Sequence, residues 1–289
     1  MRRFGTVLTA VALVGLCIAA ESSPGLAQAK TAETVMAGAR AALGGEAKIA
    51  AVKTFIVTGR TRQVRGENLV PIEFEIQAEL PDRYSRRDEF PAQDAGPVTA
   101  GFVGDGLVLI PRPVPPPPRP GAPAPPPQAQ EMMLRQRMMQ AKQDFARLLL
   151  GMFAGTTTAF PVTYSYVGQA EAPQGKADVI EVKGSANFAA RLFVADNGLP
   201  IMLSWTGGQG AQRAQGAPGA APGPPPAGAP SAPAVEQRMF FADYRDVDGL
   251  KLPFRIRRAA GTETTEETTF DRYRINAKVD PRRFDTTAK

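Results

Sequence analysis

The sequence predicts a mainly β fold: a strongly curved antiparallel sheet, or an incomplete barrel, of about nine to eleven strands with two helices. Three observations lead to this prediction. Apolar and polar residues alternate along many short segments, which is typical of a sheet with one face on a core and the other in water. Turn signals containing Gly, Asn or Asp separate those segments. Two other stretches repeat their apolar residues at helical spacing.

The N-terminus has the composition of a secretory signal peptide. Two arginines precede an apolar run, and small residues form an A-x-A cleavage site that ends at Ala29. We therefore expect export to the periplasm with cleavage after about Ala29, which leaves a single domain over residues 30–289. Cys17 is the one cysteine and lies in the apolar run, so we expect no disulfide in the mature protein.

Two low-complexity segments interrupt the expected domain. Residues 111–129 are rich in proline, and residues 207–235 are rich in glycine, alanine and proline. Proline fixes φ and lacks an N–H group, so neither segment is expected to form a packed element. We interpret both as disordered loop expansions, because lengthening a surface loop costs little closure entropy. The alternative is that the proline run binds an aromatic groove on a partner protein.

The regular elements are expected in the following order. A helix begins near Thr31, with Glu33 favourably placed in its first turn. Hairpin turns are expected at Asp196-Asn197-Gly198 and at Asp248-Gly249. Strands are expected in the segments KTFIVTGRTRQV, PIEFEIQAEL, TAGFVGDGLVLI, FPVTYSYVGQ, ADVIEVKG, NFAARLFVADNGLPIMLSW, EQRMFFADYRDVDGLKLPFRIRR and ETTEETTFDRYRI.

The last expected hairpin carries many charges. We interpret Arg257 and Arg258 as charges on the outer surface of the sheet rather than as a phosphate site. Glu263, Glu266 and Glu267 are placed to pair with the basic side chains across this hairpin.

The segment QEMMLRQRMMQAKQDFARLLLGMF (Gln130–Phe153) breaks the β pattern. Its apolar residues recur at spacings of three and four, which predicts an amphipathic helix of about six turns. It holds five of the nine methionines, and methionine packs against variable shapes on binding surfaces. The helix is therefore either a permanent plug of the core or a lid over a ligand cavity.

The composition excludes several kinds of chemistry. The chain has no histidine, and its only cysteine is in the expected signal peptide, so Ser-His-Asp triads, Cys-His pairs and zinc sites with imidazole or thiolate ligands are excluded. The carboxylate pairs Asp243 with Asp246 and Glu266 with Glu267 are interpreted as solvated charges. The net charge of +6 is spread along the strands, unlike that of nucleic-acid-binding proteins. We predict a protein without catalytic residues, cofactor or metal.

The order helix, strands, helix and further strands resembles the LolA/LolB-like superfamily of periplasmic lipoprotein-sorting and lipid-binding proteins. The resemblance is carried by AALGGEAKIAAVKTFIVTGR, AELPDRYSR, GFVGDGLVLI, LFVADNGLPIMLSW and ADYRDVDGLKLPFRI. It implies an incomplete barrel whose mouth is covered by helices around an apolar cavity. One position departs from it: Leu80 replaces the arginine that latches the lid of the localisation factor, so ATP-driven lipoprotein shuttling is not expected.

The resemblance implies a carrier for lipid or lipoprotein acyl chains, in which the Met-rich helix is the lid. Peripheral contact with the membrane is compatible with the basic net charge. The alternative is a structural or regulatory envelope protein with a self-filled barrel that binds a protein partner. A carrier predicts a cavity beneath the helix, and a filled barrel predicts none. The candidate cavity residues are Phe74, Ile76, Leu134, Met138, Phe145, Leu148, Met152, Trp205, Phe254 and Ile256.

Overall fold

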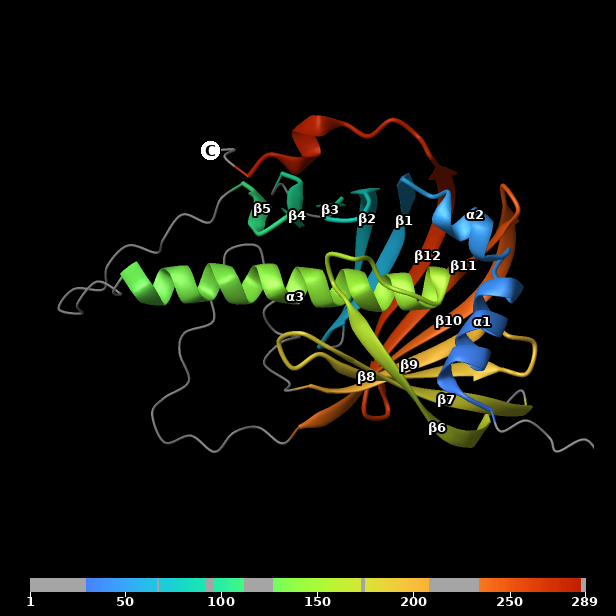
Figure 1. Cartoon of the computed structure of the whole chain (residues 1–289). Helices are drawn as coiled ribbons and strands as arrows, with labels where there is room; N and C mark the ends of the chain where they lie inside the picture. Colours follow the sequence, from blue (N-terminus) through green and yellow to red (C-terminus); the bar gives the residue numbers. More distant parts are fainter. Residues whose placement is uncertain are drawn as a thin grey trace, which may run out of the picture. The chain divides into compact units, whose positions relative to one another are not determined.

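A single antiparallel sheet of twelve strands dominates the computed structural model, which describes residues 30–66, 68–91, 96–111, 127–172, 175–207 and 234–286 (Figure 1). The strands are β1 (Thr54–Arg65), β2 (Asn68–Glu79), β3 (Arg83–Glu89), β4 (Val98–Val103), β5 (Gly106–Ile110), β6 (Val162–Ala172), β7 (Gly175–Gly184), β8 (Ala189–Ala195), β9 (Pro200–Gly207), β10 (Val235–Val247), β11 (Leu250–Ala260) and β12 (Glu263–Ile275). The curved, open antiparallel fold expected from the sequence is confirmed. The expected signal peptide and most of both inserts lie outside the described residues.

The described part of the chain has one strand, one short α-helix and one 3-10 helix more than expected. The additional strand is β3, whose sequence RYSRRDE lacks the apolar alternation by which the others were found. The helix expected near Thr31 is α1 (Ala32–Ala42), and a separate short helix, α2 (Glu46–Ala50), follows Gly44 and Gly45. The Met-rich helix is α3 (Pro127–Phe153), so residues 127–129 are helical although they were assigned to the first insert.

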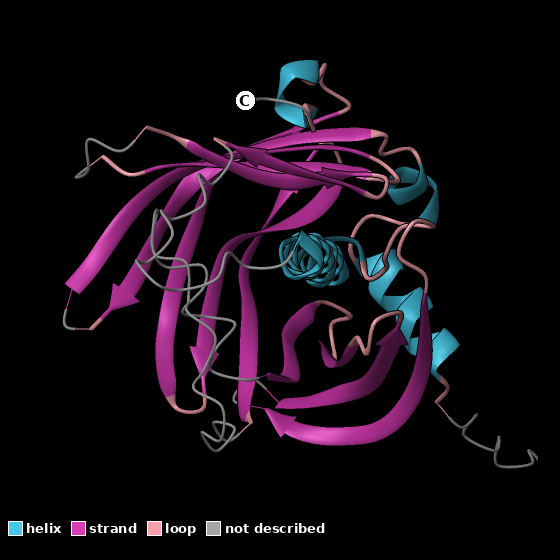
Figure 2. Cartoon of the chain, turned by 90° about the vertical axis from the view of Figure 1, so that its left-hand side faces the viewer, coloured by secondary structure: helices cyan, strands magenta, loops and turns pink. Residues whose placement is uncertain are grey.

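The strand order places α3 between the two edges of the sheet. The order is β5-β4-β3-β2-β1-β12-β11-β10-β9-β8-β7-β6, so β1 and β12 are central neighbours. The chain runs outward from β1 to the edge strand β5, passes through α3, and returns from the other edge strand, β6, to β12. Figure 2 views α3 end-on, with the strands curving around it. α3 therefore lies on the concave face of the open sheet.

The expected hairpin at Asp248-Gly249 has the geometry that its sequence predicts. Val247 and Leu250 are paired across a two-residue connection between β10 and β11. Both Asp248 and Gly249 have positive φ, at 54° and 79°, as a type I′ turn requires. The turn is held against the first helical segment, since the Lys251 amide donates a hydrogen bond of 2.9 Å to the Leu43 carbonyl.

Helices α1 and α2 cover one end of the concave face. Thr31 caps α1, because its hydroxyl accepts a hydrogen bond of 3.2 Å from the Thr34 amide. The buried side chains of Val35, Met36 and Ala39 join the same apolar core as the C-terminal half of α3. α3 ends beside α1, where Arg40 Nη1 donates a hydrogen bond of 3.4 Å to the carbonyl of Ala154.

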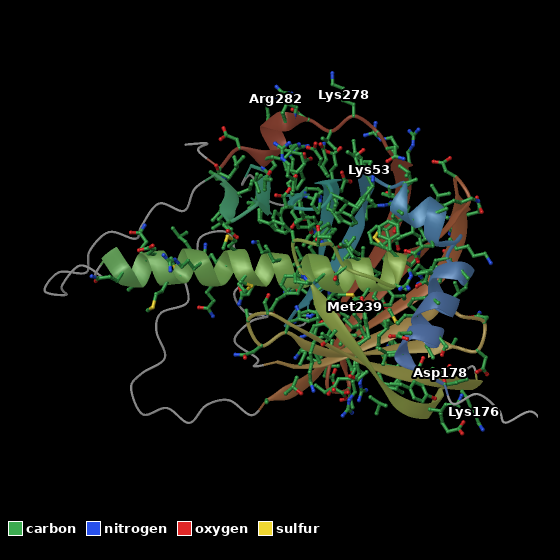
Figure 3. All side chains as sticks on the ribbon, viewed as in Figure 1. Lys53, Lys176, Asp178, Met239, Lys278 and Arg282 are labelled. Carbon is green, nitrogen blue, oxygen red and sulfur yellow. The ribbon has the colours of Figure 1, made fainter. Side chains whose placement is uncertain are left out.

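The C-terminal segment covers part of the outer face of the sheet. It contains the short 3-10 helix η1 (Pro281–Phe284). Arg283 pairs with Glu75 at 2.6 Å, and the Asp280 amide donates a hydrogen bond of 2.8 Å to Gln77 Oε1. Lys278 and Arg282 point away from the sheet, whereas Met239 lies beneath α3 among the inward side chains (Figure 3). None of the helices in the described ranges is long and apolar enough to span a membrane.

Candidate functional site

The predicted cavity residues gather where α3 meets the concave face of the sheet. Seven of the ten are buried in one apolar core: Phe74, Ile76, Phe145, Leu148, Met152, Phe254 and Ile256. Met138 and Trp205 are partly buried against that core. Leu134 is not brought to it and is 36% exposed, because α3 extends beyond the strands at its N-terminal end (Figure 1).

In this conformation, the side chains of α3 themselves occupy the concave face. The Phe145 ring lies 4.5 Å from the Tyr84 ring, 5.7 Å from Phe102 and 6.3 Å from Phe55 between ring centroids. The backbone also approaches closely, since a Cβ on Gly151 would lie 2.1 Å from the ring of Phe241. The contacts of Phe145 are those of a packed core rather than of a helix above an open cavity.

The concave face changes from apolar to polar along the strands, in the direction of the projecting end of α3. The closed end, near α1, is lined by buried aromatic and aliphatic side chains. On four strands the inward side chain becomes polar toward that end, although by register these positions lie on different rungs of the sheet. The changes are from Val57 to Thr61 on β1, from Phe270 to Thr268 on β12, from Ile256 to Arg258 on β11 and from Tyr84 to Arg86 on β3.

Arg86 begins a charged network that links these polar positions through side-chain contacts. Its Nε donates a hydrogen bond of 2.7 Å to Asp88, and its Nη2 donates one of 3.3 Å to the hydroxyl of Thr61. The guanidinium also lies 4.5 Å from the centroid of the Phe74 ring. Burial lowers the pKa of Arg86, but the charges of Asp88 and Glu266 outweigh it and raise this pKa above its usual value. Arg86 therefore remains a cation within the concave face.

Arg258 connects the sheet part of the network to α3. Its guanidinium lies 3.7 Å from Glu266 Oε1 and 4.0 Å from Asp144 Oδ1 of α3. Glu266 accepts a hydrogen bond of 3.1 Å from Thr268, whose hydroxyl is 2.8 Å from that of Thr61. The polar chain thus runs from β3 through β1, β12 and β11 to α3. Among the described residues, no hydrogen-bond acceptor reaches the buried Nε of Arg258.

Arg147 is a cation on α3 itself, at the face of the helix that is buried against the sheet. Its Nη1 donates a hydrogen bond of 2.9 Å to Asp144, and its guanidinium lies 4.4 Å from the Trp205 ring centroid and 5.3 Å from that of Phe188. Burial lowers the pKa of Arg147, an effect that Asp144 partly offsets. Its Nε is also buried and lacks a hydrogen-bond partner within the described ranges.

The network, here called the mouth network, comprises Arg86, Asp88, Asp144, Arg147, Arg258 and Glu266 together with the hydroxyls of Thr61 and Thr268. The sequence interpretation of Arg258 as a charge on the outer surface is wrong, because its side chain faces α3 on the concave side. Glu266 and Glu267 lie opposite Arg258 and Arg257 as expected, but Glu263 lies opposite Ala260, so its expected pairing with a basic side chain is wrong. The interpretation of Glu266 as a solvated charge is also wrong, because its side chain is only 13% exposed beside Arg258. Inward orientation was predictable from alternation, since Arg258 continues the inward series of Phe254 and Ile256.

A polar depression of about 380 Å³ lies elsewhere, mostly between outward-facing side chains. Its lining includes Arg60 paired with Asp271 at 3.1 Å and Arg87 paired with Glu89. This depression is not the apolar cavity that the sequence predicts. In the described part of the chain, no cluster of three or more acidic, cysteine or histidine side chains is arranged to hold a metal ion.

Comparison with solved structures places this architecture among known folds. A LolA superfamily protein from Nitrosomonas europaea aligns with 89% of this chain and 98% of its own, at 11% identity and a TM-score of 0.51. Weaker similarities are found with an outer membrane lipoprotein-sorting protein domain from Vibrio parahaemolyticus (8% identity, 87% and 96% of the two chains, TM-score 0.49) and a DUF1329 family protein from Desulfovibrio piger (7%, 88% and 97%, TM-score 0.45).

The chain therefore has the fold of the LolA superfamily, as the sequence resemblance implied. Comparison with protein-family models gives no match, and neither does comparison with curated proteins. At 11% identity the likeness concerns the fold alone, because one fold can carry many functions.

Proposed function

We propose that the protein is a non-catalytic periplasmic carrier for an acyl chain or a similar lipophilic ligand, and that α3 must move to admit it. The observation that supports this proposal most is the mouth network between α3 and the sheet. A permanently buried helix is stabilised best by apolar contacts, because burying charges costs desolvation free energy that their attraction often does not recover. Charges at an interface that opens regain their hydration, whereas exposed apolar surface costs about 25 cal/mol per Å².

The architecture supplies a suitable place for the ligand. The closed end of the concave face is lined by buried apolar residues, and it holds Phe145, Leu148 and Met152 of α3. An acyl chain that replaces these side chains would gain about 0.8 kcal/mol for each buried methylene group. Displacement of α3 is thus an exchange of one apolar occupant for another rather than the exposure of an empty core.

The projecting end of α3 supports delivery at a membrane surface. Met132 is 68% exposed, and Met133 and Leu134 are exposed beside it. Arg135 and Arg137 follow on the same helix, and Arg135 pairs with Glu131 at 2.7 Å. Apolar side chains flanked by basic ones suit the interface of an anionic bilayer, where both kinds of side chain contribute to binding.

A second candidate function has a specific observation in its favour. The tight aromatic packing of Phe145 is what a self-filled barrel predicts, and such a protein would act through a protein partner. The two functions differ in whether α3 is ever displaced by a ligand.

Native mass spectrometry of the mature protein, purified without detergent from a periplasmic extract, distinguishes these functions. A carrier is expected to show a stoichiometric mass excess that solvent extraction resolves into a lipid or an acylated species. A bare polypeptide that also fails to take up a lipophilic fluorophore would contradict the carrier function. Replacing Met138 and Phe145 by Asp should then abolish uptake in a carrier with partial retention of folding, and should unfold a filled barrel.

A further inference from the structure

We propose that the ligand is an anionic amphiphile and that Arg258, assisted by Arg86, binds its carboxylate or phosphate head group at the mouth network. This inference rests on the proposed carrier function, because it assigns the chemical class of the ligand for the same concave face.

The mouth network lies between an apolar region and solvent, as the head group of an amphiphile lies between its apolar tail and water. On one side of Asp144 along α3, residues 145–153 are buried, and all of them except Arg147 and Gly151 belong to the apolar core. On the other side, residues 128–136 are exposed and α3 leaves the sheet. An acyl tail in the apolar end would therefore place its head group at the level of Arg258 and Arg86, next to solvent. A neutral hydrocarbon ligand would gain nothing from charges at this level.

The hydrogen bonds of Arg258 are incomplete in the present conformation. Its two carboxylate neighbours, Glu266 and Asp144, lie at 3.7 Å and 4.0 Å, which is beyond normal hydrogen-bond length. Its buried Nε has no acceptor among the described residues. A half-buried guanidinium presents its donors in a fork that fits a carboxylate or phosphate, so an anion with two oxygens would satisfy Arg258 better than its present neighbours do.

Asp144 acts in this conformation as an internal substitute for the ligand anion. It is the carboxylate that α3 brings to Arg258, and it also accepts the hydrogen bond of Arg147. When α3 moves away, Asp144 and Arg147 leave together, so the helix removes no net charge. Arg86 keeps its partner Asp88 on β3, whereas Arg258 is left beside Glu266 without a hydrogen bond. The vacated position opposite Arg258 is then open to an external anion.

Two probes with the same hydrocarbon chain test the proposal: cis-parinaric acid and its methyl ester, titrated into the delipidated mature protein. The wild type is expected to bind the acid more tightly than the ester. Arg258→Gln should weaken binding of the acid about tenfold, since a charge-assisted hydrogen bond is lost, and should leave the ester within about twofold. Arg257→Gln is the matched control, because Arg257 is the neighbouring residue on the same strand and faces outward.

Two further variants keep the test independent of folding defects. Arg258→Lys retains the charge without the planar fork and should give an intermediate loss for the acid. Asp144→Asn removes the competing carboxylate and should strengthen binding of the acid severalfold with little effect on the ester. Urea unfolding of each variant shows whether the fold is retained.

The outcomes separate this proposal from the carrier function itself. If Arg258→Gln lowers the binding affinity for the acid and for the ester equally, or lowers neither, the anionic head-group site is overturned while the carrier function stands. Displacement of bound parinarate by hexadecanoate alone assigns a carboxylate, displacement by hexadecyl phosphate alone assigns a phosphate, and equal displacement by hexadecanol also overturns the proposal. A wild-type protein that binds neither probe contradicts the carrier function.

Discussion

The two halves of α3 share one helix but lie in opposite environments. Residues 145–153 are buried against the sheet and against α1, and their side chains are almost all apolar. Residues 128–144 run from full exposure to partial burial, and their contacts with the sheet include the ion pairs of Asp144 with Arg258 and of Lys142 with Asp105. α3 is therefore attached firmly at one end and loosely at the other.

The physical difference between the halves lies in the cost of separating them from the sheet. Detaching the apolar half exposes large side chains to water, at about 1.5–3 kcal/mol for each Phe, Leu or Met. Detaching the charged half returns ions to water, which recovers much of the separation cost. Opening is therefore expected to begin at the projecting end of α3 and to reach the apolar half only when a ligand replaces it.

The largest expected effect is that of truncating the apolar half. Phe145→Ala should lower the free energy of unfolding by about 3–5 kcal/mol, because a buried ring in contact with three other aromatic rings leaves a cavity. Met133→Ala in the exposed half is the control and should change it by less than about 0.5 kcal/mol. Urea denaturation followed by circular dichroism measures both. Similar losses in the two variants would remove the distinction between the halves.

A comparable loss is expected at alkaline pH from the tyrosine that packs on the apolar half. Burial raises the pKa of Tyr84 to about 12, above the value of 10.0 expected in the unfolded chain. The folded protein thus retains a proton that the unfolded chain loses, so the contribution of Tyr84 to stability is constant below about pH 10 and decreases as the pH rises to 12. The loss at completion is about 3 kcal/mol.

Urea denaturation between pH 8 and pH 12 measures this decrease. Tyr84→Phe should make it shallower, and a slope that Tyr84→Phe does not alter would assign the effect to other groups. Burial raises the pKa of Tyr273 as well, so a residual decrease is expected in that variant.

A smaller effect is expected from the hydrogen bonds that hold the C-terminal turn of α3. The hydroxyl of Tyr244 on β10 lies 2.9 Å from the carbonyl oxygen of Gly151 and 2.8 Å from that of Pro200, to which it donates. Tyr244→Phe should lower the free energy of unfolding by about 1–3 kcal/mol, because it leaves these carbonyls without that donor. Hydrogen exchange should also speed up at residues 148–153. Faster exchange confined to the projecting end would contradict a firm attachment at Gly151.

The smallest effect on stability, with a selective effect on binding, is expected at the projecting end. Met132→Gln should change the free energy of unfolding by less than about 0.5 kcal/mol, since Met132 is exposed. It should reduce co-sedimentation with phosphatidylglycerol vesicles severalfold, while binding to phosphatidylcholine vesicles stays weak throughout. Val167→Gln is the control, because Val167 is 55% exposed on β6. Equal reductions in the two variants would contradict a membrane-facing role for the end of α3.

The parts of the fold that sequence reasoning found are those with a strong local period. The alternation in PIEFEIQAEL predicts β2, because one face of that strand packs on the core. The spacing of apolar residues predicts α3, because one side of that helix packs on the core. β3 was missed because RYSRRDE has no apolar alternation: Tyr84 faces the core, but the next inward positions hold Arg86 and Asp88 of the mouth network. Local patterns therefore fail where a strand turns charge toward the interior.

The fold class, the hairpin turns and the apolar stripe of α3 follow from the sequence alone, because φ preferences and period-two or period-3.6 burial are properties of short segments. Which charges face inward together depends on the tertiary structure. Arg86, Arg258 and Asp144 are far apart in the sequence. They come together because the sheet curves and because the chain returns to its centre, where β12 pairs with β1. The filling of the concave face by α3 in this conformation also depends on the tertiary structure, because packing depends on distances between elements, and no local sequence pattern encodes them.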